Sequence, residues 1–271
     1  MLKILFVPDI VGKIGRNAVR QELPHLKKKY QPDVIIANVE NLAHGIGATQ
    51  KTLDEMKEIG IDLFTSGNHI WDKAGSAEML DNLANRLVRP ANYPQKKSGV
   101  GVLQANIGEI KLNVVNLQGR VYHGWNKEEQ EYLHCPFKTL EKIIAGDRQA
   151  LYLVDFHADA TSEKTALATY FDGQVQAIFG THTHIQTADE RILERGTAFI
   201  SDAGSVIYAD SVIGADKNQV WNLFLKTGRT SKKHDLPSTG LAVFNAVYLE
   251  LDEKSRRAKK IERINKIIEV K

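Results

Sequence analysis

The sequence predicts an α/β protein in which mixed β-sheets are flanked by helices. Short apolar runs alternate with helical stretches along most of the chain, which is typical of parallel strands joined by crossover helices. Two pairs of apolar runs are separated by short turns and predict antiparallel hairpins, so the sheets should be mixed. No repeat, low-complexity segment or linker divides the chain, and we therefore expect one domain over residues 1–271.

The first third of the chain is predicted to form three strand–helix units. Thr49 is a favourable N-cap for the second helix, and Gly60 is a favourable stop. Pro24 predicts either a kink in the first helix or a late start. The expected strands are Leu2–Val7, Val34–Asn38 and 61–65, and the expected helices are 16–29, Gln50–Ile59 and 75–84.

The remainder combines hairpins with further strand–helix alternation. A hairpin of 100–104 with 110–116 comes first, and a second hairpin of 241–251 with 257–264 closes the chain. Between them we expect strands at 151–156, 175–179 and 198–201, with a helix at 161–171. Strand–helix alternation with hairpins at intervals favours a sandwich of mixed sheets with its helices outside.

Composition excludes several classes of protein. The chain has 271 residues, of which 42% are hydrophobic and 25% charged, so it is neither fibrous nor largely disordered. A single cysteine, Cys135, excludes a disulfide framework and a cysteine-based zinc site within one chain. No run approaches the roughly 18 apolar residues of a membrane span, and the apolar run at the N-terminus is too short for a signal peptide. We expect a cytoplasmic protein without a membrane partner.

The formal net charge of +3 is unevenly distributed. Residues 253–271 hold eight Lys and Arg against three Glu, which leaves 28 basic and 30 acidic residues in the first 252. A basic end on a nearly neutral body is weak evidence for a nucleic acid partner. We expect 254–271 to be a solvated hairpin strand with its extension, and we keep an RNA partner as a secondary hypothesis.

Polar side chains lie just after five of the predicted strands. The carboxyl ends of strands in open α/β sheets form the crevice in which ligands bind. Carboxylates, amides and imidazoles are the ligands of divalent metals, so five such strand ends predict a metal site. Asp72, Asp159 and Glu163 are interpreted instead as residues at helix starts. The residues after the strands are Asp9, Glu40-Asn41, Gly67-Asn68-His69, His157 and His182-Thr183-His184.

These residues resemble the five motifs of calcineurin-like metallophosphoesterases, and more closely those of the YmdB branch of bacterial phosphodiesterases. The resemblance runs over nearly the whole chain and implies a metallophosphoesterase-like sandwich. Further motifs that carry it are Asn-Leu-Ala-His-Gly at 41–45, Gly-Asn-His-Ile-Trp-Asp at 67–72, Arg-Pro-Ala-Asn at 89–92, Asp-Phe-His-Ala at 155–158, Ala-Thr-Ser-Glu-Lys at 160–164, and Gly-Thr-His-Thr-His at 180–184 followed by Gln-Thr-Ala-Asp at 186–189.

The resemblance implies two metal ions bridged by one carboxylate. The first motif lacks the histidine usual in the superfamily, since Ile10 and Val11 follow Asp9, and the bridging position falls on Glu40. Three imidazoles favour Fe, Mn or Zn over Mg or Ca. The implied ligands are Asp9, Glu40, Asn41 and His184 for the first ion, and Glu40, Asn68, His157 and His182 for the second.

The implied reaction is hydrolysis of a phosphodiester by in-line attack of a metal-bridging hydroxide. His69 would be the general acid that protonates the leaving alkoxide. The substrates implied by the resemblance are cyclic nucleotides such as 2′,3′-cAMP, and a homo-oligomer is expected. An alternative is a metal-containing regulatory or RNA-associated binding protein with little turnover. The sequence differs from the pattern of the YmdB branch at three places, which bear on the choice between these two functions. They are Pro8, Val39 and the segment 205–208.

Overall fold

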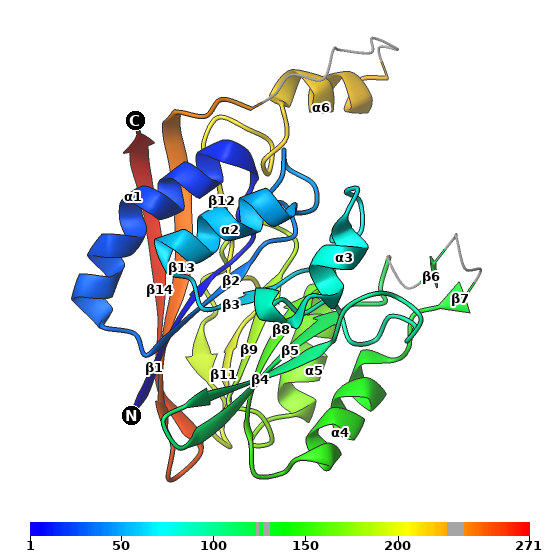
Figure 1. Ribbon diagram of the computed structural model, residues 1–271, viewed down its shortest axis with the longest axis vertical. Coiled ribbons are helices and arrows are strands. Elements are labelled where there is room, and N and C mark those ends of the chain that lie inside the picture. Colours follow the sequence, from blue (N-terminus) through cyan, green and yellow to red (C-terminus); the bar gives the residue numbers. More distant parts are fainter. Residues whose placement is uncertain (123–124, 127–130, 227–235) are drawn as a thin grey trace.

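Two six-stranded β-sheets pack against each other in the computed structural model, and helices cover the outer face of each (Figure 1). The structure describes residues 1–122, 125–126, 131–226 and 236–271. The predicted fold class, mixed β-sheets flanked by helices, is confirmed, because both sheets combine parallel and antiparallel strands.

The first sheet has the order β12-β13-β1-β2-β3, with β14 paired to β13. Its three N-terminal strands are parallel, and β13 runs antiparallel to β1. The central strands are buried on both faces, which explains their nearly continuous apolar sequence. The strands are β1 (Leu2–Val7), β2 (Val34–Asn38), β3 (Leu63–Thr65), β12 (Val206–Tyr208), β13 (Gly240–Asp252) and β14 (Arg257–Val270).

The second sheet has the order β10-β11-β9-β8-β5-β4. Its four central strands are parallel, and an antiparallel strand lies at each edge. The strands are β4 (Val102–Ile107), β5 (Ile110–Gln118), β8 (Leu151–His157), β9 (Ala177–Thr181), β10 (Arg191–Ile192) and β11 (Ala198–Ile200); a separate small hairpin contains β6 (Trp125–Asn126) and β7 (Glu131–Tyr132).

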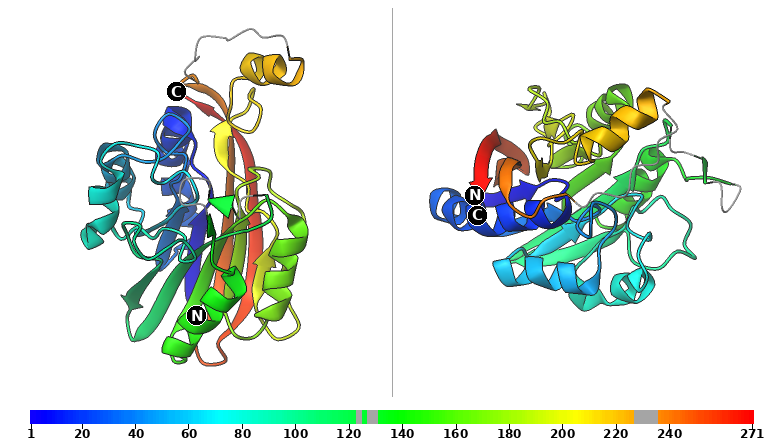
Figure 2. Two further views of the ribbon diagram at one scale, coloured as in Figure 1. Left: turned by 90° about the vertical axis from the view of Figure 1, so that its right-hand side faces the viewer. Right: turned by 90° about the horizontal axis from the view of Figure 1, so that it is seen from above.

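The helices form the outer layers, as the perpendicular views show (Figure 2). No helix among the described residues is long and apolar enough to cross a membrane. The first sheet is covered by α1 (Gly12–Tyr30), α2 (Gln50–Ile59) and α3 (Ser76–Asp81), which the short 3₁₀ helix η1 (Leu83–Asn85) follows. The second is covered by α4 (Pro136–Gly146) and α5 (Thr161–Tyr170), and α6 (Lys217–Phe224) has no buried residue.

Local sequence signals account for most element boundaries. Thr49 caps α2 with a capping box, and Gly60 ends it in the left-handed conformation, both as predicted. The first helix starts at Gly12 and continues through Pro24, so the proline does not mark a late start. The predicted helix at 75–84 is divided into α3 and η1. The last strand continues to Val270 instead of ending at residue 264, because it pairs with β13 over its whole length.

A core between the sheets holds their facing surfaces together. Phe6 of β1 stacks on Phe179 of β9, with ring centroids 4.7 Å apart, and both rings are fully buried. Valine, isoleucine and leucine side chains from both sheets surround this pair. This packing fixes the relative position of β1 and β9, whose carboxyl ends carry Asp9 and His182.

Replacing Phe6 with Ala should lower the free energy of unfolding by about 3–5 kcal/mol, because it opens a cavity between the sheets. Urea denaturation measures the loss. The control is Phe224→Ala on α6, where the side chain is 78% exposed and the change should stay within about 0.5 kcal/mol. A similar effect of both substitutions would contradict this account of the core.

Candidate metal centre and active site

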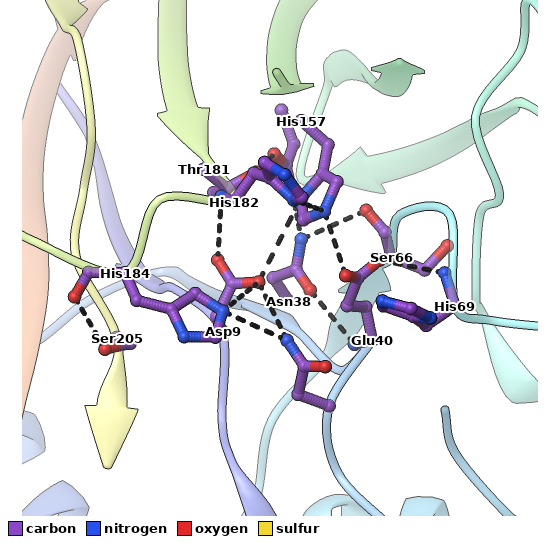
Figure 3. Close-up of polar contacts among 12 residues, drawn as sticks. Asp9, Asn38, Glu40, Ser66, His69, His157, Thr181, His182, His184 and Ser205 are labelled. Atoms are coloured by element: carbon purple, nitrogen blue, oxygen red, sulfur yellow. Dashed lines mark hydrogen bonds and ion pairs between the residues drawn. The ribbon is translucent and has the colours of Figure 1, made fainter. Parts of the chain in front are cut away.

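The carboxyl ends of strands from both sheets meet at one edge of the sandwich (Figure 3). The first sheet contributes residues after β1, β2 and β3, and the second contributes the ends of β8 and β9. Most of the metal ligands implied by the sequence are thereby gathered into two neighbouring groups.

The first group contains Glu40, His157 and His182. The Nε2 atom of His157 lies 3.0 Å from Oε1 of Glu40 and 3.0 Å from Nδ1 of His182. One ligand atom from each of the three residues falls within 4.8 Å of the others, a spacing suited to a single metal ion. Glu40 and His157 are buried, and His182 is partly exposed. This group holds three of the four ligands implied for the second ion.

The second group contains Asp9, Asn41 and His184. The Asn41 amide nitrogen lies 3.4 Å from Oδ1 of Asp9 and 3.2 Å from Nε2 of His184. The same His184 nitrogen is 3.7 Å from the Asp9 carboxylate. The two groups adjoin, since Nδ1 of His157 is 4.0 Å from Asp9. A carboxylate, an amide and an imidazole thus converge where the first ion was expected.

The loop after β3 is shaped to approach these groups closely. A Cβ atom on Gly67 would lie only 1.9 Å from Oε2 of Glu40 and 2.4 Å from a carbon of the His157 ring, so only glycine fits there. The next residue, Asn68, has a buried side-chain oxygen without a hydrogen-bond partner among the described residues. Such an orphaned acceptor is costly unless something binds it, and a cation satisfies it. The residues present therefore fit a metal.

Burial and ion pairing set the charge of Glu40. Burial alone would raise its pKa, but the adjacent His157 imidazolium outweighs this effect and lowers the pKa to about 2. Burial likewise opposes the charge of His157, yet the Glu40 carboxylate raises the imidazole pKa to about 9. Glu40 therefore stays ionised at neutral pH, and a positive charge beside it compensates the burial, whether a proton on His157 or a metal ion.

A hydrogen-bonded relay orients His157 from behind. The Thr181 hydroxyl donates to Oδ1 of Asp155 at 2.6 Å, so its single proton is used and it accepts from Nδ1–H of His157 at 2.9 Å. This tautomer leaves the Nε2 lone pair directed at the first group, as a ligand requires. Asp155 also accepts hydrogen bonds from Asn38 and Thr65 of the other sheet. Burial raises the Asp155 pKa to about 7 despite these donors.

The loop that carries the other two histidines is held in an uncommon conformation. His182 and His184 have φ angles of 96° and 65°, in the left-handed region that non-glycine residues seldom occupy. Asp202 accepts hydrogen bonds from the backbone and hydroxyl of Thr183 between them, and it pairs with the buried Lys164. The strain is thus maintained by surrounding contacts, and it brings both imidazoles toward the centre.

A backbone carbonyl orients His184. Its Nδ1–H donates to the Ile213 carbonyl at 2.7 Å, which leaves Nε2 free to face Asp9 and Asn41. The Ser205 hydroxyl donates to the His184 carbonyl at 2.8 Å. The segment 205–208 therefore supports the centre through β12, and none of its residues lines the adjacent pocket.

His69 lies at the rim of this pocket, beside the ligand groups (Figure 3). Its backbone N–H donates to Oε2 of Glu40 at 3.3 Å, and its Nδ1 lies 2.6 Å from Asp72. The interpretation of Asp72 as a helix cap is wrong, because the N-cap position of α3 is Gly75 and the Asp72 carboxylate holds the imidazole of His69. The sequence held one signal for this contact, because His69 and Asp72 are only three residues apart.

Sequence reasoning missed part of the pocket wall. The pocket has a volume of 370 Å³, and residues 213–215 form one side of it although no motif marks them. Asp159 lines it as well, with its carboxylate 3.5 Å from Nε2 of His182. Glu163, by contrast, binds the backbone N–H groups of Arg120 and Val121 and is structural.

The comparisons with known proteins identify the family. The family model described as "YmdB-like protein" matches residues 5–264. The chain belongs to the YmdB-like family. A relative from Bacillus subtilis named "2′,3′-cyclic-nucleotide 2′-phosphodiesterase" is 40% identical over 270 residues, with 97% of this chain and 96% of the relative covered.

Solved structures agree with this assignment. A Mycoplasma pneumoniae protein described as a novel phosphatase has a TM-score of 0.88 and 36% identity, with 99% of this chain and 94% of that chain covered. A Thermus thermophilus protein described as hypothetical also has a TM-score of 0.88, at 33% identity over both full chains. A 5′-nucleotidase precursor from Thermus thermophilus has a TM-score of 0.61 at 12% identity, covers 99% of this chain with 54% of its own length, and shows the fold alone. The YmdB-like chain thus has the fold of the metallophosphoesterases, as the resemblance implied.

Thr181→Val should weaken metal binding by about 10–100-fold, because it removes the hydroxyl that fixes the His157 tautomer. Competition with a chelating dye measures the affinity. Thr181→Ser should restore it, and Thr169→Val on the exposed face of α5 should have no effect. Wild-type affinity in Thr181→Val would refute the relay.

Proposed function

We propose that this YmdB-like protein is a metal-dependent phosphodiesterase that hydrolyses cyclic nucleotides such as 2′,3′-cAMP. The observation that carries the proposal is the convergence of two adjoining ligand groups and one unassigned imidazole, His69, on a single pocket. The name of the Bacillus subtilis relative supports this class of substrate.

Two metal ions would occupy the centre in this proposal. Asp9, Asn41 and His184 would hold one, while Asn68, His157 and His182 would hold the other, and Glu40 would contact both. Bound divalent metals neutralise charge on phosphoryl oxygens and supply a hydroxide nucleophile at neutral pH. Three imidazoles beside few carboxylates favour Fe, Mn or Zn over Mg or Ca.

His69 would donate the proton that the leaving alkoxide requires. It lines the pocket but belongs to neither ligand group, and its backbone contact with Glu40 holds it beside the centre. The Asp72 carboxylate at Nδ1 leaves Nε2 as the atom available to the substrate. Asp72 is therefore a positioning residue for His69.

The RNA-associated alternative has no specific support in the structure. Its sequence basis was the basic segment 254–271, which contains the whole of β14 and pairs along β13. Arg263 and Lys266 of that strand form ion pairs with Glu190 and Glu22, so part of the positive charge is neutralised within the chain. The other basis, the segment 205–208, lies outside the pocket lining.

We also propose that the protein forms a homo-oligomer, which analytical ultracentrifugation by sedimentation would test.

His69→Ala should retain both metal ions and lose about 10²–10⁴-fold in kcat. Asp72→Asn should lose less, because the imidazole remains and only the carboxylate that orients it is removed. Metal analysis of each variant accompanies the kinetics, with His25→Ala on the exposed face of α1 as the control. Metal loss in His69→Ala, or unchanged turnover, would remove His69 from the role of general acid.

The proposed function itself is tested with metal-loaded protein. Metal content is measured first, and hydrolysis of 2′,3′-cyclic nucleotides, 3′,5′-cyclic nucleotides and bis-p-nitrophenyl phosphate is then compared. We expect two transition-metal ions per chain and fastest turnover of the 2′,3′-cyclic substrate. Two bound metals without hydrolysis of any diester would favour a binding protein instead.

A further inference from the structure

A second pocket lies away from the metal centre, between α4 and the segment that leads into β4. Its volume is 870 Å³, within the range of small-molecule sites. None of the described residues that line it also lines the pocket at the metal centre. The second pocket is therefore a separate feature that the proposed reaction leaves unexplained.

An unpaired arginine stands in the wall of this pocket. Arg89 is only 6% exposed, and its guanidinium forms no ion pair with any described carboxylate. Nη1 donates to the Pro90 carbonyl at 2.8 Å, whereas the buried Nε has no hydrogen-bond partner among the described residues. Burial without a compensating charge lowers the Arg89 pKa. A buried cation with an unused donor is costly, and an anion in the pocket would offset that cost.

Other features of the pocket complement a phosphate anion. Lys138 and Lys142 lie one turn apart on the exposed face of α4 and line the opposite wall. None of the described residues that line the pocket is acidic. Arginine and lysine without carboxylates form the usual recognition set for phosphate groups.

Part of the remaining wall is apolar. Ala91 and Pro94 on one segment, with Val102 and Ile143 on the neighbouring elements, provide a surface on which a planar base can pack. A ligand with one anionic group and one flat apolar part matches both halves of the pocket. Inorganic phosphate would use only the cationic half.

We propose that this second pocket binds a nucleoside monophosphate, with its phosphate on Arg89, Lys138 and Lys142 and its base on the apolar wall. The site is distinct from the metal centre. The segment 88–92, which carries Arg89, is hydrogen-bonded at both of its ends to residues next to the centre. Val88, next to Arg89, accepts a hydrogen bond from Ser66, which directly precedes the Gly67-Asn68 loop. Asn92 at the other end of the segment binds the backbone of Gln118, whose strand partner is His157.

The test is a calorimetric titration of AMP into metal-loaded protein. Lys138→Glu/Lys142→Glu should lose one class of AMP site or weaken it at least tenfold, while hydrolysis of bis-p-nitrophenyl phosphate stays unchanged. Arg20→Glu/Lys28→Glu on the exposed face of α1 is the matched control with the same change of charge, and it should bind AMP as the wild type does.

A second variant tests the buried arginine. Arg89→Met retains the apolar stem and removes the unpaired charge, so its melting temperature without AMP should equal or exceed that of the wild type, while the rise in melting temperature produced by AMP becomes smaller. Equal AMP binding by the wild type and Lys138→Glu/Lys142→Glu would overturn the proposal. So would inorganic phosphate binding as tightly as AMP, or a parallel loss of hydrolysis, which would make this pocket part of the active site.

Discussion

The buried pair of Glu40 and His157 is the constraint on which the rest of the site depends. Glu40 follows β2 of the first sheet and His157 ends β8 of the second, so their contact crosses the interface between the sheets. A carboxylate buried to this degree remains ionised only beside a compensating positive charge. The edge of the sandwich is therefore shaped to hold cations, and the hydrogen bonds around it serve that requirement.

A polar seam surrounds this pair and extends the connection between the sheets. Asn38 and Thr65 of the first sheet bind Asp155 of the second, and the Ser66 hydroxyl lies within hydrogen-bond distance of Asn116. Below the seam the interface is apolar and centred on the Phe6–Phe179 stack. Apolar packing thus supplies the adhesion between the sheets, while the seam specifies how their carboxyl ends align. The residues proposed as metal ligands, which follow or end five strands, can then converge without long loops.

The departures from the branch pattern are accommodated by the backbone around the centre. Pro8 follows the last residue of β1, where the missing N–H leaves the β1–β2 pairing intact. Val39 is buried and donates its N–H to Thr65, which continues the pairing of β2 with β3. The segment 205–208 forms β12, and Val206 exchanges backbone hydrogen bonds with Asp9 and Val11. Each departure lies behind the ligands, so the side chains that face the pocket are preserved.

The amino-acid sequence by itself determined the fold class, most strands and the residues that gather at the centre. Those features follow from local apolar patterning, from capping residues such as Thr49, and from the rule that polar residues after parallel strands share one edge. Only the tertiary structure decided the roles of Asp72, Thr181 and Asp155, the wall at 213–215, and the unpaired charge of Arg89. A hydrogen-bond partner or the burial of a charge depends on which distant segments pack together, and no periodicity or motif within one segment carries that information.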